Sequence, residues 1–317
     1  MKNITYKEQK VLTSLRGQNG RVTARFLVEE TSLYPTEVSR LLKKLAVRGL
    51  VTLEPHGICL TTSGQWPSPN SLDLITETAY KSLKVLNAED RPPPNAEFDQ
   101  CAATPETTVR RFVYLFARGD LHEKQLLLLG DDDLLSVPVA MSRVARSVQV
   151  LDIDKHLLSY VATIAARNGL DIETHKYDVR EALPLSLRGH ADVVITDPPY
   201  TTAGIDMFLA RACQALQNRI GSVCYLSYSP MDLELGDIWH VQRTISRTGF
   251  IITDKVPNFN FYRPRDDMAQ DVSFALPDDP TYPWFRSCWL RLVVARVPLK
   301  ANTEIDGDIY GYPESSK

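Results

Sequence analysis

From residue 107 onward, short runs rich in Val, Ile and Leu alternate with amphipathic segments of helical length. The apolar runs lie within residues 124–133, 147–154, 172–179, 191–200, 221–228 and 249–256. Strands this apolar are typically buried on both faces, and helical connections between them indicate parallel pairing. The pattern therefore predicts an α/β fold with a parallel sheet covered by helices.

Acidic residues follow four of these runs. They are Asp131 to Asp133, Asp152 with Asp154, Asp178, and Asp197. Parallel sheets bind their ligands beyond the carboxyl ends of the strands, so we expect one site at this edge. Asp152 is placed to accept both hydroxyls of an adenosine ribose, and Asp178 to accept the exocyclic amine of adenine. Each could instead cap a helix. Together they favour the S-adenosyl site of a class I methyltransferase-like (Rossmann-like) fold.

The turn after the first run contains one glycine and three aspartates, Gly130 to Asp133. Three adjacent carboxylates would repel the carboxylate of S-adenosylmethionine. Decarboxylated S-adenosylmethionine lacks that group and ends in an ammonium, and polyamines are cationic throughout. Residues 71–317 have a charge balance of −8, which concentrates such cations and repels phosphate backbones. Helix capping would explain one of the aspartates and leave two unexplained.

Residues 195–204, ITDPPYTTAG, place an aspartate, two prolines and a tyrosine at the end of an apolar run. The prolines turn the chain out of the sheet. A carboxylate within reach of an amine can accept its proton, and both Asp197 and Asp132 are candidates for this role. We expect Pro198 and Tyr200 to contact the substrate, with Tyr200 packing on methylenes or offering a cation–π face.

Residues 1–68 are typical of a winged-helix domain. Three helices are predicted within residues 6–18, 22–30 and 36–50, followed by a hairpin. Residues 1–70 carry a charge balance of +5, and the third helix presents Ser39, Arg40, Lys43, Lys44 and Arg48 outward. A helix that reads a major groove has such a face. Four cations are few for nucleic-acid binding, and winged helices also serve in dimerisation or substrate capping, so nucleic acid is not the favoured partner.

The remaining boundaries follow from composition. A helix and a Pro-rich linker are expected over 69–97, the Rossmann-like domain over 98–300, and an acidic, flexible tail over 301–317. The tail acids Glu304, Asp306 and Asp308 could fold over the site. The five cysteines and six histidines are scattered without metal-ligand spacing, and no run is long enough to span a membrane. We therefore expect a cytoplasmic protein with reduced thiols and no metal.

Six motifs in a fixed order resemble the branched-chain polyamine synthases, the N4-bis(aminopropyl)spermidine synthases. The motifs are FDQ (98–100), TPET (104–107), GDDD (130–133), LDID (151–154), DPPYT (197–201) and NFNFY (258–262). The resemblance implies transfer of aminopropyl groups from decarboxylated S-adenosylmethionine to the secondary amine of spermidine. The products would be N4-aminopropylspermidine, then N4-bis(aminopropyl)spermidine, with methylthioadenosine released. It also implies a homodimer and no further cofactor.

Two sets of site residues follow from these motifs. The donor is expected on Gln100, Gly130, Asp131, Asp152 and Asp178. The polyamine is expected on Asp132, Asp133, Asp197, Pro198 and Tyr200. Two other functions remain open: an S-adenosylmethionine-dependent DNA or RNA amino-methyltransferase, which also uses DPPY, and a winged-helix regulator that senses polyamines. The acidic second domain argues against the first, and intact carboxylates at every expected strand end argue against the second.

Overall fold

The computed structural model describes residues 4–16, 18, 20–61, 71–217, 219–230, 233–263, 285–297 and 309. Its contacts divide the chain into two compact units. One comprises Met1–Glu77 with Val113–His122, and the other comprises Thr78–Phe112 with Glu123–Lys317. Each unit is described separately below.

The amino-terminal unit contains three helices followed by a two-stranded antiparallel hairpin, as expected. The elements are α1 (Tyr6–Arg16), α2 (Ala24–Thr31), α3 (Pro35–Val47), β1 (Val51–Glu54) and β2 (Gly57–Leu60). Thr23 begins α2 by accepting a hydrogen bond from the Phe26 amide, and Pro35 stands at the first position of α3. The apolar faces of the three helices meet in one core that includes Leu12, Leu27 and Leu41.

The larger unit is built around a seven-stranded sheet within the described residues. Its strands are β3 (Gln125–Leu129), β4 (Ser147–Asp152), β5 (Glu173–Lys176), β6 (Val193–Thr196), β7 (Val223–Tyr228), β8 (Phe250–Phe261) and β9 (Arg286–Val294). The helical elements are α4 (Ser71–Leu86), η1 (Ala96–Phe98), α5 (Pro105–Ala117), α6 (Ser136–Met141), α7 (Lys155–Asn168), η2 (Leu185–Leu187), α8 (Thr202–Ala215) and α9 (Leu235–Arg247). α4 and α5 each continue across the boundary between the two units.

The strand order is β5-β4-β3-β6-β7-β9-β8. The first five strands in this order pair in parallel, as the sequence predicts. β9 is antiparallel to both β7 and β8, so the expectation of a wholly parallel sheet was wrong at this edge. β9 was also missed as a strand, although its Trp289 to Val294 segment is as apolar as the predicted strands, with Arg291 as its single charge.

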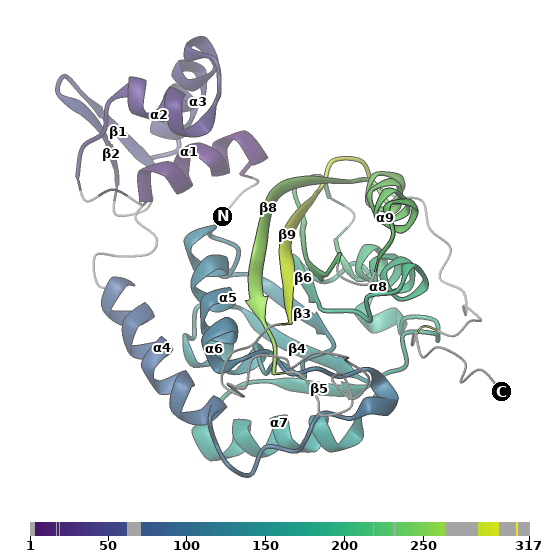
Figure 1. Cartoon of the computed structure of the whole chain (residues 1–317). Coiled ribbons are helices and arrows are strands. Elements are labelled where there is room, and N and C mark those ends of the chain that lie inside the picture. Colours follow the sequence, from purple (N-terminus) through teal and green to yellow (C-terminus); the bar gives the residue numbers. More distant parts are fainter. Residues whose placement is uncertain are drawn as a thin grey trace, which may run out of the picture. The chain divides into compact units, whose positions relative to one another are not determined.

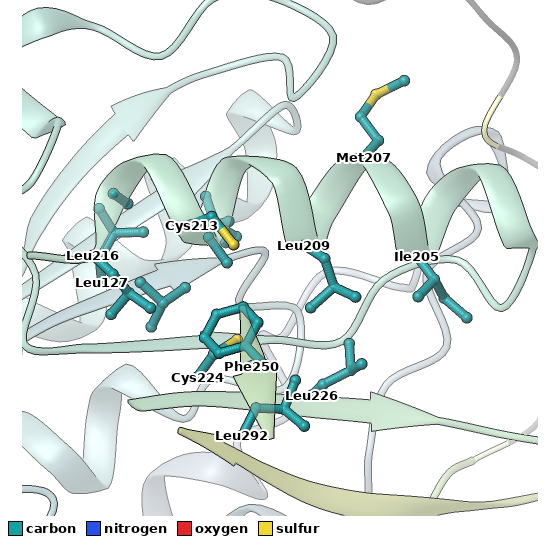
Figure 2. Close-up of a cluster of buried hydrophobic side chains, with 14 of the residues drawn as sticks. Leu127, Ile205, Met207, Leu209, Cys213, Leu216, Cys224, Leu226, Phe250 and Leu292 are labelled. Atoms are coloured by element: carbon teal, nitrogen blue, oxygen red, sulfur yellow. The ribbon is translucent and has the colours of Figure 1, made fainter. Parts of the chain in front are cut away.

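Helices cover both faces of this sheet, with α8 and α9 on one and α6 and α7 on the other (Figure 1). Figure 2 shows Ile205 and Leu209 of α8 directed toward Leu226 of β7 and Leu292 of β9. Because β3 to β6 run in parallel side by side, their carboxyl ends lie along one edge. The four acidic strand ends predicted to share an edge therefore do so.

Three further observations concern the described residues. No helix among them is long and apolar enough to cross a membrane. All five cysteines are thiols, and no cluster of His, Cys, Asp and Glu in the described part of the chain is arranged to hold a metal ion. The tail acids Glu304, Asp306 and Asp308 lie outside the described residues. Ile309, by contrast, is buried in the core on the α8 side, and its carbonyl accepts a 2.9 Å hydrogen bond from Thr201 Oγ1.

Candidate active site

A cleft opens at the carboxyl edge of the parallel strands, with an empty volume of about 620 Å³ that includes open solvent at its mouth. Six of the predicted site residues line it: Gln100, Gly130, Asp132, Asp152, Asp178 and Asp197. The apolar part of the lining includes Phe98, Leu151, Tyr177, Pro199 and Phe208. The cleft therefore combines carboxylates with an apolar wall, as a site for a nucleoside bearing a cationic chain requires.

The backbone at Gly130 explains why a glycine begins the acidic turn. Its φ is +78°, a conformation that side chains other than glycine rarely adopt, and its amide donates to the Leu151 carbonyl at 2.8 Å. A Cβ at this position would meet no atom within 4 Å. The requirement for glycine is thus the backbone conformation, which turns the aspartates that follow in different directions.

The three aspartates of this turn have three different environments. Asp131 is buried, and its Oδ1 accepts the Ser136 amide at 3.2 Å at the start of α6. Asp133 is buried against α5, where it accepts the Ala103 amide at 2.5 Å and pairs with the Arg111 guanidinium. Neither side chain lines the cleft. Asp132 is the one aspartate of the three that does.

Among the described residues, no donor forms a hydrogen bond with the Asp132 carboxylate, although its backbone carbonyl accepts from Arg91. Burial raises the pKa of Asp132 well above its usual range, and the nearby carboxylates of Asp133 and Asp197 raise it further. A carboxylate with free lone pairs and a raised pKa is suited to accept a proton or an ammonium.

Asp197, at the end of β6, has a carboxylate that is already occupied by the protein. Oδ1 accepts the Tyr200 hydroxyl at 2.8 Å, and Oδ2 accepts both the Tyr262 hydroxyl and Arg111 Nη2 at 2.7 Å. A carboxylate offers about four lone-pair sites, so about one remains for a substrate.

Tyr200 lies beside this carboxylate, and its hydroxyl is also 2.7 Å from the Tyr262 hydroxyl. Its ring packs with Tyr262 and Phe285, at centroid distances of 6.5 and 6.0 Å. Both neighbouring prolines are buried, and the one that lines the cleft is Pro199 rather than the predicted Pro198.

Asp152, at the end of β4, lines the cleft with a carboxylate held by two backbone amides. Oδ1 accepts from Asp154 at 2.8 Å, and Oδ2 accepts from Asp131 at 3.2 Å. Burial raises the pKa of Asp152 to about 6. Gln100 approaches from the neighbouring loop, where its amide donates to Asp154 at 3.2 Å and accepts the Asn95 amide at 2.7 Å.

Asp178 also lines the cleft, and the Arg180 guanidinium binds its carboxylate. The guanidinium donates to both carboxylate oxygens, with Nη2 at 2.6 Å from Oδ2. Burial acts to raise the pKa of Asp178, but the hydrogen bonds from Arg180 outweigh it and the pKa is lowered. An adenine amine at Asp178 would share the carboxylate with Arg180.

Sequence reasoning missed Arg111 and assigned no role to Asn260 or Tyr262. Arg111 lies on α5 between Thr108 and Leu115, which are both buried, so it stands on the apolar face of the helix. A charged residue on an apolar helix face indicates a buried ion pair, and this was the available signal. The partners of Arg111 could not be inferred because they come from distant strands.

The comparisons with known proteins agree with this geometry. Residues 79–317 match the family described as the C-terminal domain of branched-chain polyamine synthase A. An N(4)-bis(aminopropyl)spermidine synthase from Thermococcus kodakarensis is 35% identical over 226 residues, which cover 70% of this chain and 64% of that protein. A synthase of the same name from Methanocaldococcus jannaschii is 32% identical over 270 residues, which cover 82% of this chain and 75% of that protein.

An uncharacterized Methanocaldococcus jannaschii protein is 39% identical over 205 residues, and this alignment spans 51% of its length. The chain thus spans between about half and three quarters of the curated relatives it matches. Among solved structures, the branched-chain polyamine synthase from Thermus thermophilus has a TM-score of 0.69 and 26% identity. That match covers 96% of this chain and 91% of that one.

The Thermus structure is a complex with N4-aminopropylspermidine and 5'-methylthioadenosine. A putative RNA methyltransferase from Pyrococcus horikoshii, with a TM-score of 0.53 and 14% identity, shares the fold. The family match covers most of the chain, and it includes the cleft and its carboxylates. The chain belongs to the branched-chain polyamine synthase family.

Proposed function

We propose that this protein is an aminopropyltransferase that moves aminopropyl groups from decarboxylated S-adenosylmethionine to the secondary amine of spermidine. The observation that carries the proposal is Asp132, whose carboxylate lines the cleft and accepts no hydrogen bond from any donor among the described residues. Membership of the polyamine synthase family supports it, as does the bound pair of product and methylthioadenosine in the Thermus relative.

The transfer is a displacement at carbon. The amine nitrogen attacks the aminopropyl carbon beside the sulfonium, the new N–C bond forms, and the C–S bond breaks. Its electrons return to sulfur, which leaves as the neutral thioether of methylthioadenosine. The attacking amine must be neutral, and deprotonating an alkylammonium of pKa near 10.4 at pH 7 costs about 4–5 kcal/mol.

We assign the role of accepting the amine proton to Asp132. Asp132 and Asp197 are the two carboxylates that the sequence leaves open for this role. Three donors already occupy Asp197, whereas no hydrogen-bond donor among the described residues reaches the Asp132 carboxylate. A base with a raised pKa accepts an amine proton more readily than an ordinary aspartate does.

The other contacts follow from the lining of the cleft. We expect Asp152 to bind the ribose hydroxyls, and the apolar wall with Tyr177 and Phe208 to contact the adenine. Asp133 contributes negative charge without lining the cleft, and burial, which raises the pKa of Asp131 to about 8, keeps Asp131 protonated at neutral pH. In a second transfer a tertiary amine would become a permanent cation, and this dense negative charge would stabilise it.

Mass spectrometry tests the proposal directly. The full chain is incubated with spermidine and decarboxylated S-adenosylmethionine, beside a control reaction with S-adenosylmethionine. We expect mass gains of one and then two aminopropyl units in the first reaction, with methylthioadenosine as the co-product. Unchanged spermidine across several acceptors and temperatures would overturn the assignment.

We infer further that the amino-terminal unit is a winged helix whose third helix does not read DNA. Arg40 of α3 pairs with Glu37 at 2.8 Å, and Lys44 and Arg48 both pair with the buried Glu8 of α1, at 2.9 and 3.3 Å. These three cations are thus held by two carboxylates of the same unit. Gel-shift assays at physiological salt should therefore show no complex with duplex DNA, and a stable complex would restore the methyltransferase or regulator alternatives.

The family resemblance leads us to propose a homodimer. Light scattering coupled to size exclusion measures the molar mass of the particle, and the mass of one chain is 35.7 kDa. A particle of twice this mass supports the proposal, and a monomer at micromolar concentration rejects it.

A further inference from the structure

Three motifs of the sequence come together at one side chain. The acidic turn after β3, the DPPY segment after β6 and the NFN segment of β8 are far apart in the chain. Arg111 of α5 forms hydrogen bonds to a residue of each: Asp133, Asp197 and Asn260. The common partner of the three motifs is thus a residue that belongs to none of them.

The contacts of this guanidinium use four of its five N–H donors. Nη1 donates to Asp133, Nη2 donates to Asp197 at 2.7 Å and to the Tyr262 hydroxyl at 3.0 Å, and Nε donates to Asn260 at 2.8 Å. The guanidinium carbon also lies 4.8 Å from the centroid of the Trp289 ring. A lysine ammonium could not reproduce this planar set of contacts.

The environment of Arg111 makes its positive charge permanent. The side chain is 2% exposed. Burial alone would lower the pKa of Arg111, but the Asp133 carboxylate, together with Tyr262 and Asp197, raises it well above its usual range. One buried cation therefore compensates two carboxylates, and both are turned toward α5.

Asp132 is influenced by both of these carboxylates. The titratable groups near it are Asp131 and Asp133 in its own turn, Asp152 after β4, Asp197 after β6, Arg91 before η1, and Asp99 in the lining of the cleft. Asp133 and Asp197 exert the largest repulsion among the neighbours of Asp132. Arg111 is bound to both of them.

We propose that Arg111 is a positioning residue that withdraws Asp133 and Asp197 from the polyamine and leaves Asp132 as the carboxylate that receives the reacting amine. The inference deepens the proposed function and rests on it. Without the guanidinium fork, one of the two carboxylates would be released to compete for the ammonium groups. The amine would then bind in positions from which it cannot attack.

The test is the substitution Arg111→Lys, assayed for aminopropyl transfer over a range of pH. The lysine keeps one positive charge but reaches fewer partners, so Asp132 experiences more uncompensated negative charge. We expect kcat to fall about tenfold or more while KM for spermidine stays unchanged or falls, because misplaced amines still bind. We also expect the acid limb of the pH–kcat profile to move to higher pH.

Two further variants separate positioning from a purely structural role. Tyr262→Phe removes one donor from Asp197 and one partner from Arg111 but retains the ring. We expect a smaller fall in kcat and a smaller shift of the acid limb than in Arg111→Lys. Arg211→Lys is the matched control, because Arg211 is also fully buried but binds the Val179 and Arg180 carbonyls. We expect it to lower the melting temperature and leave the pH profile in place.

The outcomes are distinct. If Arg111→Lys loses stability but retains kcat per folded enzyme and an unshifted pH profile, Arg111 is structural only and the inference is wrong. If this variant does not fold, the profile of Tyr262→Phe decides in the same way. If the wild-type chain transfers no aminopropyl group, the proposed function fails. In that case, calorimetric titration measures spermidine binding over the same pH range and tests Arg111 separately. If the pH dependence of binding is unshifted in both Arg111→Lys and Tyr262→Phe, the positioning role of Arg111 is wrong.

Discussion

Arg111 Nη2 lies 2.7 Å from Asp197 Oδ2, and this ion pair joins α5 to the carboxyl end of β6. The side chains are 2% and 14% exposed, so water screens the pair weakly. The same Oδ2 also accepts the Tyr262 hydroxyl. The pairing occupies Asp197, whereas no donor among the described residues forms a hydrogen bond with the Asp132 carboxylate that lines the same cleft.

The first prediction compares Asn substitutions at the two candidate bases. Asp132→Asn should lower kcat by about 10²–10⁴-fold, because the proton acceptor is lost, and should leave the melting temperature nearly unchanged. Asp197→Asn should instead lower stability by about 3–5 kcal/mol, because the buried guanidinium loses a charged partner. Steady-state kinetics of both variants measure the change in kcat, and thermal unfolding measures the change in stability. The assignment of Asp132 fails if Asp132→Asn transfers at a near-normal rate while binding methylthioadenosine normally.

The second prediction concerns pH and the buried Asp131. Burial raises the pKa of Asp131 to about 8, and its Oδ2 has no hydrogen-bond partner. The folded state thus holds this proton more tightly than the unfolded state, so its contribution to stability is complete below pH 4 and is lost as pH rises through 8. Asp131→Asn has no proton to lose.

Relative to wild type, Asp131→Asn should therefore gain about 2–3 kcal/mol of stability between pH 6 and pH 9. Denaturant unfolding at the two pH values measures the difference. Equal pH dependence in both proteins would show that Asp131 ionises normally in the fold.

The third prediction tests the close approach of α8 to the DPPY segment. A Cβ on Gly204 would lie 2.7 Å from the Pro199 carbonyl oxygen and 3.0 Å from Thr201 Oγ1. Gly204→Ala should therefore displace this segment, lower stability by about 1–3 kcal/mol and reduce activity. Gly236→Ala is the control, since a Cβ at Gly236 in α9 would meet no atom within 4 Å and alanine favours the helix. Similar losses in both variants would argue against the close contact.

The fourth prediction tests the burial of Ile309. Its side chain is 1% exposed within the core cluster beside α8. Ile309→Ala should cost about 2–5 kcal/mol in the free energy of unfolding. Ile220→Ala, at a residue that is 65% exposed, should change stability by no more than about 0.5 kcal/mol. A neutral Ile309→Ala would mean that this residue does not pack against the core in solution.

Much of the fold could be predicted from local patterns. The apolar runs predicted the five parallel strands, and the acidic residues after them predicted the edge at which the cleft lies. β9 was missed although its run is equally apolar, and the antiparallel edge could not be predicted because an apolar run does not state the direction of its pairing. The resemblance of the motifs to the polyamine synthases was confirmed by the family match.

The sequence by itself determined the kind of site and its charge, because alternating apolar segments fix the parallel strands and aspartates follow them in the chain. Only the tertiary structure decided which aspartates face the ligand. Asp131, Asp132 and Asp133 are identical side chains in consecutive positions, and the positive φ of Gly130 and the surrounding donors send them in three directions. Arg111 binds Asp133 of this turn together with Asp197 and Asn260. These partners lie 22, 86 and 149 residues away from Arg111 in the chain, a separation that no local sequence pattern spans.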